Sequence, residues 1–153
     1  MATTPGAIRD AMIALVAAID PATHGHQPFR AHREQMDFRE WAEANPSSCL
    51  RRFSIMFTGD REAPLVTNGL VEEVSETVDV LVAYPNDSRH GVKPGTSVAD
   101  VATSDIRQIH HALHVANSPA GATVLRLADS RDISGPVTFA VIRYRVDYFW
   151  SLT

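Results

Sequence analysis

The stretch TFAVIRYRVDYFW, residues 138–150, alternates its side chains between two faces without a break. One face carries apolar and aromatic residues, namely Ala140, Ile142, Tyr144, Val146, Tyr148 and Trp150. The other face mixes apolar with charged residues, namely Phe139, Val141, Arg143, Arg145, Asp147 and Phe149. A period of two predicts a β-strand, and this one exceeds the usual length of about 5–6 residues. We expect it to lie at the centre or at a seam of a sheet, with a surface that another subunit could cover.

The composition is typical of one globular domain that spans residues 1–153, because 44% of the residues are hydrophobic and 21% are charged. The formal net charge of −4 argues against a general binder of nucleic acid or anionic membranes, since both need a basic surface. Cys49 is the only cysteine, so no internal disulfide can form and a reducing compartment is expected. The first residues lack the pattern of a signal peptide, and the apolar run after them is too short to span a bilayer. We therefore expect a soluble protein made in a cytoplasm.

Periodicity and turn residues divide the rest of the chain into helices and strands. The predicted elements are a helix at 4–19 capped by Thr3 or Thr4, a strand at Leu50–Thr58, a strand at Val71–Tyr84, a helix at Val98–Ala116 capped by Ser97, and a strand at Thr123–Ala128. A turn is expected from Asp129 to Pro136. The fold class is α+β, with a mixed or antiparallel sheet. The element order is α-β-β-α-β-β, with a long hairpin, a long C-terminal strand and the helices packed on one face.

Residues 21–49 are broken up by prolines and glycines and form an irregular excursion from this order. The charged part from Arg30 to Ala44 tolerates a helix, with Phe38 and Trp41 three residues apart, and a short helix or a non-helical excursion would both fit. Loops of this length are often functional, so contact with a partner is one expectation for this segment.

Histidines offer the most visible candidates for a metal site. His24, His26 and His32 cluster in the excursion, and His110 and His114 are one helical turn apart, which is a spacing that zinc sites use. No cysteine or carboxylate supplies an obvious third ligand, and histidine pairs at this spacing are common on ordinary helices. We therefore predict no metal and no cofactor.

Catalytic motifs are lacking in the sequence. Neither a phosphate-binding loop nor a nucleophile elbow occurs. Cys49 lies beside Arg51 and Arg52, which could activate a thiol, but a small residue at the start of a strand is the simpler interpretation. We expect the protein not to be an enzyme.

Charged residues on the last strand form a row, because Arg143, Arg145 and Asp147 all share one face. Within one chain this row would make a cross-strand charge network on a solvated face. In an assembly it could pair with acidic strand positions such as Glu73 and Asp79, either in the same chain or in a neighbour.

Taken in this order, the elements resemble the tail terminator proteins of long-tailed bacteriophages and related tail-like particles. The resembling parts are the opening helix Thr4–Ile19, the hairpin that starts at Arg51-Arg52-Phe53-Ser54-Ile55, the return strand Val71–Tyr84, the helix Val98–Ala116 that begins Ser-Val-Ala-Asp, and the ending Phe139–Tyr148. The resemblance implies a non-enzymatic virion protein of the tail or neck, assembled in the host cytoplasm. It would form a hexameric ring on the last ring of tail tube protein, stop tube growth and dock the head connector or stopper protein. Genomic DNA would pass through the lumen without specific binding.

Nine residues are expected at subunit or partner interfaces. They are Arg143, Arg145, Asp147, Tyr148 and Trp150 on the last strand, Asp60 and Arg61 in a polar loop at 59–70, and Arg89 and His90 in a polar loop at 85–97. Two alternatives stay open. One is a head-completion, stopper or other neck or minor tail protein, and the other is a small metal- or ligand-binding α+β domain.

Overall fold

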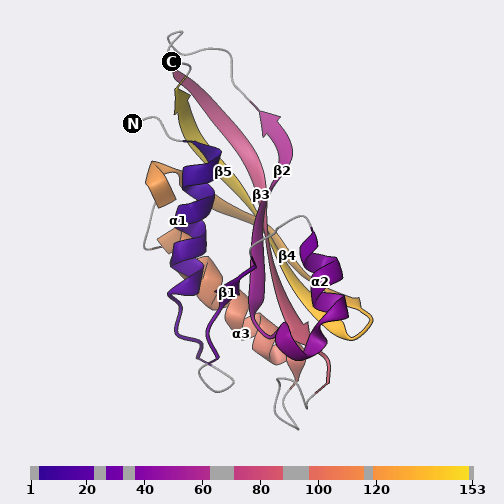
Figure 1. The fold of residues 1–153 in the computed structure, drawn as a ribbon. Coiled ribbons are helices and arrows are strands. Elements are labelled where there is room, and N and C mark those ends of the chain that lie inside the picture. Colours follow the sequence, from indigo (N-terminus) through magenta and orange to yellow (C-terminus); the bar gives the residue numbers. More distant parts are fainter. Residues whose placement is uncertain are drawn as a thin grey trace.

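A single five-stranded sheet organises the chain in the computed structural model (Figure 1). The structure describes residues 4–22, 27–32, 37–62, 71–87, 97–115 and 119–151, with the backbone alone at 60–62, 71–72, 115 and 150–151. The strands are β1 (Arg30–Ala31), β2 (Arg52–Glu62), β3 (Val71–Pro85), β4 (Thr123–Ser134) and β5 (Val137–Ser151). The helices are α1 (Pro5–Ala17), α2 (Phe38–Ala44) and α3 (Val98–His110). The fold is α+β, and none of the helices in these ranges is long and apolar enough to cross a membrane.

β5 lies in the interior of the sheet, whose strand order is β1-β2-β3-β5-β4. It pairs antiparallel with β3 from Val71↔Ser151 to Pro85↔Val137 and with β4 on its other side. The last strand is therefore an interior strand, although β3 occupies the centre of the sheet. The predicted antiparallel hairpin of β2 and β3 is confirmed. Alternation explains the register, since a slip of one residue would turn the buried face of β5 into solvent.

Side-chain caps begin both long helices at the expected residues. The Thr4 hydroxyl accepts a hydrogen bond from the Ala7 amide at 3.2 Å, and Pro5 follows at the first helical position. The Ser97 hydroxyl accepts from the Ala99 amide at 3.2 Å, and α3 continues past His110 as a π-helical turn over His111–Val115. The two predicted helices are thus confirmed, with ends that differ by a few residues.

α1 and α3 cover one face of the sheet and form the larger core with it. The buried residues alternate along the strands, with Val78, Val80, Val82 and Tyr84 on β3 and Ala140, Ile142, Tyr144 and Val146 on β5. Ile8, Met12 and Val16 of α1 and Val101, Ile106 and Ile109 of α3 pack on them. Side chains of this size each contribute about 1.5–3 kcal/mol when fully buried, so this layer is the main source of stability.

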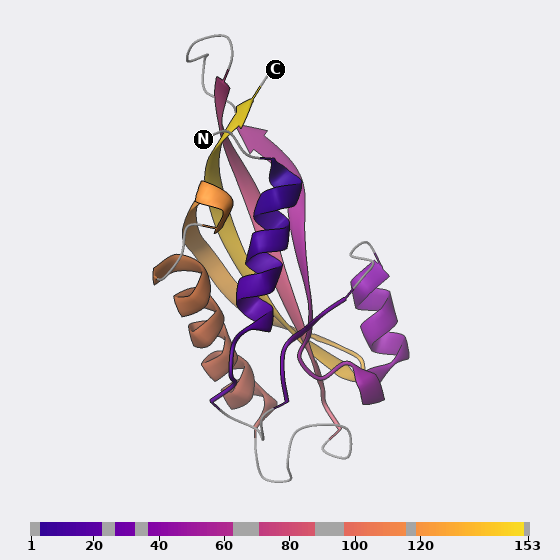
Figure 2. The same ribbon diagram turned by 60° about the vertical axis from the view of Figure 1, so that its left-hand side comes forward.

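α2 packs on the opposite face, which corrects the expectation that all helices lie on one face (Figure 2). Phe38 and Ala42 of α2 are buried with Leu81, Ala83 and Phe139, whose side chains alternate with those of the larger core. The Phe38 and Phe139 rings meet edge to face at 6.0 Å. The second face of the sheet therefore also carries an apolar surface, and α2, which belongs to the excursion at 21–49, buries it.

The expected order α-β-β-α-β-β lacks β1 and α2, which both come from the excursion. β1 pairs parallel with β2 at Arg30↔Arg52 and Ala31↔Phe53, so the sheet is mixed. Of the two possibilities left open for this segment, the short helix is confirmed. The two residues of β1 are too few for any periodic signal in the sequence.

Two strands run further than the sequence indicates. β2 continues through Gly59, whose φ of +84° accompanies a shift in pairing between Phe57 and Arg61. The expected loop at 59–70 is therefore wrong for 59–62, and 63–70 lie outside the described residues. The turn expected from Asp129 to Pro136 is also wrong, because β4 runs to Ser134 and only Gly135 and Pro136 turn the chain.

Candidate functional site

The half of the sheet that α2 leaves uncovered carries the row of charged residues predicted from the sequence. We call this surface the open face and define it by Glu73, Ser75, Thr77 and Asp79 of β3, Arg143, Arg145, Asp147 and Phe149 of β5, and Leu125 of β4. These residues lie directly across from one another in the register, as in Thr77↔Arg145 and Leu125↔Arg145. Figure 2 shows α2 near one end of the sheet, while the strands continue beyond it.

Arg143 and Asp79 form a two-pronged ion pair on the open face. Their atoms meet at 2.8 Å (Nε to Oδ1) and 3.0 Å (Nη2 to Oδ2). The Arg143 side chain is 53% exposed and that of Asp79 is 15% exposed. Both residues are opposite each other in register, so the cross-strand network expected within one chain is present for this pair. Because one partner is solvated, the pair contributes about 0–1 kcal/mol, and its main effect is to fix the orientation of the guanidinium.

A second cluster of polar side chains, made by Ser75, Asp147 and Arg145, lies next to this ion pair. The Ser75 hydroxyl donates to Asp147 Oδ1 at 2.6 Å, and Arg145 Nε lies 3.3 Å from the same oxygen. Asp147 thereby orients Arg145, which lies two residues before it on the same face of β5 and is about half exposed. The result is a pre-arranged surface with two guanidiniums at its centre.

Apolar side chains border these charges. Phe149 is 47% exposed and Leu125 is 41% exposed, and each lies across from a polar residue of the open face. An exposed phenylalanine and arginines in one patch match the composition of protein interfaces, which are enriched in aromatic residues and arginine.

β4 forms one edge of the sheet, and among the described residues it pairs with β5 alone. Val124 is its only buried residue, whereas Leu127 is 50% exposed and Ile133 is 79% exposed. On the other side β1 is the edge strand, but it pairs with β2 only at Arg52 and Phe53, so most of that side of β2 is unpaired in the described part of the chain. Long edges with exposed apolar side chains attract further strands, and proteins usually shorten, charge or cover them.

Five of the nine predicted interface residues have side chains that the structure leaves undescribed. Asp60 and Arg61 belong to β2, and Trp150 belongs to β5, where the backbone alone is described. Arg89 and His90 lie outside the described residues. These five assignments stay predictions.

Tyr148 does not belong to the open face. Its side chain is 2% exposed on the face that α1 and α3 cover, and its hydroxyl donates to Glu76 Oε2 at 2.8 Å. Strand alternation turns Tyr148 away from Asp147 and Phe149, and its contribution to an interface stays a prediction. Arg143, Arg145 and Asp147 are brought together as expected.

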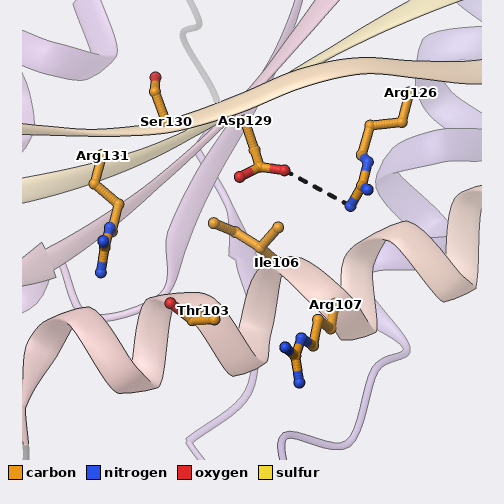
Figure 3. Close-up of a pocket in the computed structure, with 7 residues that line it drawn as sticks. All are labelled: Thr103, Ile106, Arg107, Arg126, Asp129, Ser130 and Arg131. Carbon is orange, nitrogen blue, oxygen red and sulfur yellow. Dashed lines mark ion pairs between the residues drawn. The ribbon is translucent and has the colours of Figure 1, made fainter.

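A pocket of about 440 Å³ lies between β4 and α3 on the helix-covered side (Figure 3). It is lined by Thr103, Ile106, Arg107, Arg126, Asp129, Ser130 and Arg131. Arg126 Nη1 and Asp129 Oδ2 form an ion pair at 3.6 Å, and Arg131 Nη1 donates to the Ala99 carbonyl at 3.3 Å. The sequence gives no direct signal for this pocket, since part of its strand wall, Asp129–Arg131, was expected to be a turn.

A second hollow, of about 300 Å³, lies on the side of α2 and includes Arg143 and Asp79. Arg39 of α2 and Asp132 of β4 form an ion pair across it at 3.3 Å. The hollow extends the open face toward β4, so a partner that contacts Arg143 would also reach the edge strand.

Neither the histidines nor the cysteine form a reactive centre in the described part of the chain. His110 and His114 stack at 5.1 Å, and His114 Nδ1 donates to the Val124 carbonyl at 2.7 Å. No group of three histidine, cysteine, aspartate or glutamate residues that could hold a metal occurs within the described ranges, from which His24 and His26 are missing. Burial raises the pKa of the Cys49 thiol to about 11, which is opposite to the shift of an activated cysteine.

No protein-family model matches the sequence, and no curated protein matches it either.

Proposed function

We propose that this chain is a structural subunit that caps the head-proximal end of the tail tube in a bacteriophage or a tail-like particle. Copies of it would close into a hexameric ring, stop tube growth and form the joint between head and tail. The proposal rests on the resemblance in element order and on one structural observation, namely that the two sides of the sheet are dissimilar. One side ends in β4, and the other ends in the two-residue β1, beyond which β2 has no further strand partner on that side in the described part of the chain.

Dissimilar edges on opposite sides of one sheet suit a ring. A closed ring of identical subunits needs head-to-tail contacts, in which one surface of a subunit binds a different surface of the next. β4 of one copy can approach β2 of its neighbour, and such a contact would cover Leu127 and Ile133. An exposed edge with these residues is a hazard in a monomer and a natural joint in an assembly.

The open face would then be available for the tube protein or the head connector. Arg143 and Arg145 are held by Asp79 and Asp147, so they present an ordered pair of guanidiniums beside Phe149. Ordered arginines and a partly exposed aromatic residue lower the entropic cost of binding, because few rotamers must be frozen.

A pair of lysine substitutions on the β4 edge tests the proposal. Leu127→Lys and Ile133→Lys place charges on the proposed joint without touching the core, whereas Ala14→Lys adds the same charge to the exposed side of α1. Assembly with purified tube protein is followed by light scattering and by tube length in electron micrographs. We expect the edge variants to lose the capping of tubes and the Ala14→Lys control to retain it. Capping that survives in both edge variants would contradict the proposal.

The position of the ring in electron micrographs of assembled particles distinguishes the proposed terminator role from the alternative neck roles. A ring in direct contact with the last tube ring supports a terminator, whereas a position next to the head, with no contact to the tube, indicates a head-completion or stopper protein.

A further inference from the structure

We propose that the pocket between α3 and β4 is a binding site for a phosphate group. Its lining contains three arginines, Arg107, Arg126 and Arg131, but only one carboxylate, Asp129 (Figure 3). The site is separate from the open face and does not depend on ring formation, so it goes beyond the function proposed above.

A bulge in β4 brings the charged residues of the strand onto one side. Side chains three positions apart, such as Arg126 and Asp129, normally point to opposite faces of a sheet. Here the pairing shifts between Arg126 and Ala128, so that Arg126 lies across from Tyr144 and Asp129 from Ile142, two residues of the same buried face. Arg131 follows on that face, across from Ala140. Bulges redirect side chains in this way next to functional sites.

α3 supplies the other wall of the pocket. Thr103 and Arg107 are four residues apart and therefore share one side of the helix. Figure 3 shows Arg126 and Asp129 extending from β4 toward this helix, with Arg107 on the helix below them. Arg131 reaches the first turn of α3 through its hydrogen bond to the Ala99 carbonyl.

The charge balance of the pocket favours an anion with more than one negative charge. Elsewhere in the described chain, three arginines each have a carboxylate of their own: Arg51 with Asp105, Arg143 with Asp79 and Arg39 with Asp132. In the pocket only Arg126 has an ion-pair partner within the described ranges, and that partner is 3.6 Å away. The pocket thus has two more guanidinium groups than carboxylates. A phosphate group would balance this positive charge and fit the planar arrangement of the guanidinium donors.

Neighbouring groups indicate the same preference. Tyr144 lies across from Arg126 on the helix-covered face of the sheet. Its hydroxyl is buried and has no hydrogen-bond partner among the described residues. Burial lowers the pKa of His110, and the charge of Arg126 lowers it further, while Asp129 raises it. The pocket volume of about 440 Å³ falls in the range of about 300–1,000 Å³ that is usual for ligand sites.

Isothermal titration at constant ionic strength tests the proposal with four probes: inorganic phosphate, adenosine monophosphate, a short duplex oligonucleotide and a glutamate-rich peptide. Saturable binding of phosphate or the nucleotide would support a site for a free phosphate ester. Stronger binding of the oligonucleotide, still dependent on Arg126, would support the same site with a nucleic-acid backbone as the source. Binding of the peptide alone, or of no probe, would overturn the proposal.

Two variants and a control connect the binding to the pocket. Arg126→Gln should raise the Kd for phosphate about tenfold, because a charge-assisted hydrogen bond is lost. Arg30→Gln removes the same charge from exposed β1 and should change the Kd by less than about twofold. Asp129→Asn should strengthen binding, since it removes the competing carboxylate, and a gain of affinity cannot result from misfolding. Equal affinities in Arg126→Gln, Arg30→Gln and the unmodified chain would contradict the assignment.

Discussion

Arg51 and Asp105, which lie 54 residues apart in the sequence, form a two-pronged ion pair with no solvent exposure of either side chain. The atoms meet at 2.8 Å (Nε to Oδ2) and 3.0 Å (Nη2 to Oδ1), and the Tyr84 hydroxyl donates to Asp105 at 2.6 Å. Arg51 also donates to the Gln27 carbonyl at 3.2 Å and has a φ of +55°. One buried network therefore ties α3 to the end of β3, to the residue before β2 and to the excursion.

Replacement of Asp105 by alanine should destabilise the protein by about 3–5 kcal/mol, because it leaves the Arg51 guanidinium buried without its counter-charge. Asp79→Ala, which breaks the solvated pair with Arg143, should cost about 0–1 kcal/mol. Urea unfolding followed by circular dichroism measures both free energies of unfolding. Equal losses of unfolding free energy in the two variants would contradict the expectation that the buried ion pair matters more for stability than the solvated one.

Substitutions of the neighbouring residues Tyr148 and Phe149 should affect different properties, because the two side chains point to opposite faces of β5. The first should lower stability and the second should weaken binding. Tyr148→Phe removes the hydroxyl that donates to buried Glu76 and should cost about 1–3 kcal/mol of stability. Phe149→Ala should change the free energy of unfolding by less than about 1 kcal/mol, since the ring is 47% exposed, but it should weaken binding to tube protein. Thermal melting and a co-sedimentation assay with tubes measure the two effects. A Phe149→Ala protein that melts early yet still binds tubes would assign this ring to the core.

Stability should decrease as the solution is acidified below pH 6.5, the ordinary pKa of histidine. Burial lowers the pKa of His110 in the folded chain, and the charges of Arg126 and His114 add to this shift. The unfolded chain then takes up the proton first, so the stabilisation present above pH 6.5 is lost as the pH falls through the folded pKa. Asp129 acts in the opposite direction and limits the shift. Melting temperatures between pH 5 and 8 measure this dependence.

His110→Gln should flatten that profile, whereas His111→Gln, at an exposed position, should change it much less, because His111 is the weakest of the charges that lower the pKa of His110. A profile that keeps its slope in His110→Gln would assign the dependence to another group.

Cys49 should resist thiol reagents until the protein unfolds. Its side chain is buried, its Sγ lies 3.4 Å from the Pro46 carbonyl, and its pKa is raised to about 11. At pH 8 the thiolate fraction should be lower than in the unfolded chain by about a hundredfold or more. Because the chain has one cysteine, the labelling rate with and without urea reports on this site alone. Rapid labelling of the folded protein would contradict the packing of Cys49 against α2.

Local patterns in the sequence were enough to predict the long helices and the last strand. Thr4 and Ser97 mark helix starts through contacts within three residues, and the alternation at 138–150 identifies both faces of β5. The pairing of Arg143 with Asp79 also follows from this alternation once the two strands are adjacent. These features depend on neighbours in sequence or on one choice of register.

Other features depend on contacts that leave no local pattern. Nearly all side chains of β4 are exposed, so its sequence lacks the alternation of a half-buried strand. Asp129, Ser130 and Asp132 therefore resemble a turn, although they pair with β5. Arg51 looks like a surface strand residue, and only the distant Asp105 and Tyr84 reveal that it is buried. The position of α2 on the second face depends on Leu81 and Phe139, which the sequence alone could not assign to a separate core.

Electron cryomicroscopy of tail-like particles assembled with a tagged copy of this chain tests the ring most directly. We expect a single hexameric ring at the head-proximal end of the tube, with β4 of each subunit next to β2 of its neighbour. Particles in which the tag is absent from that end, or in which it marks isolated subunits without β2–β4 contacts, would contradict it.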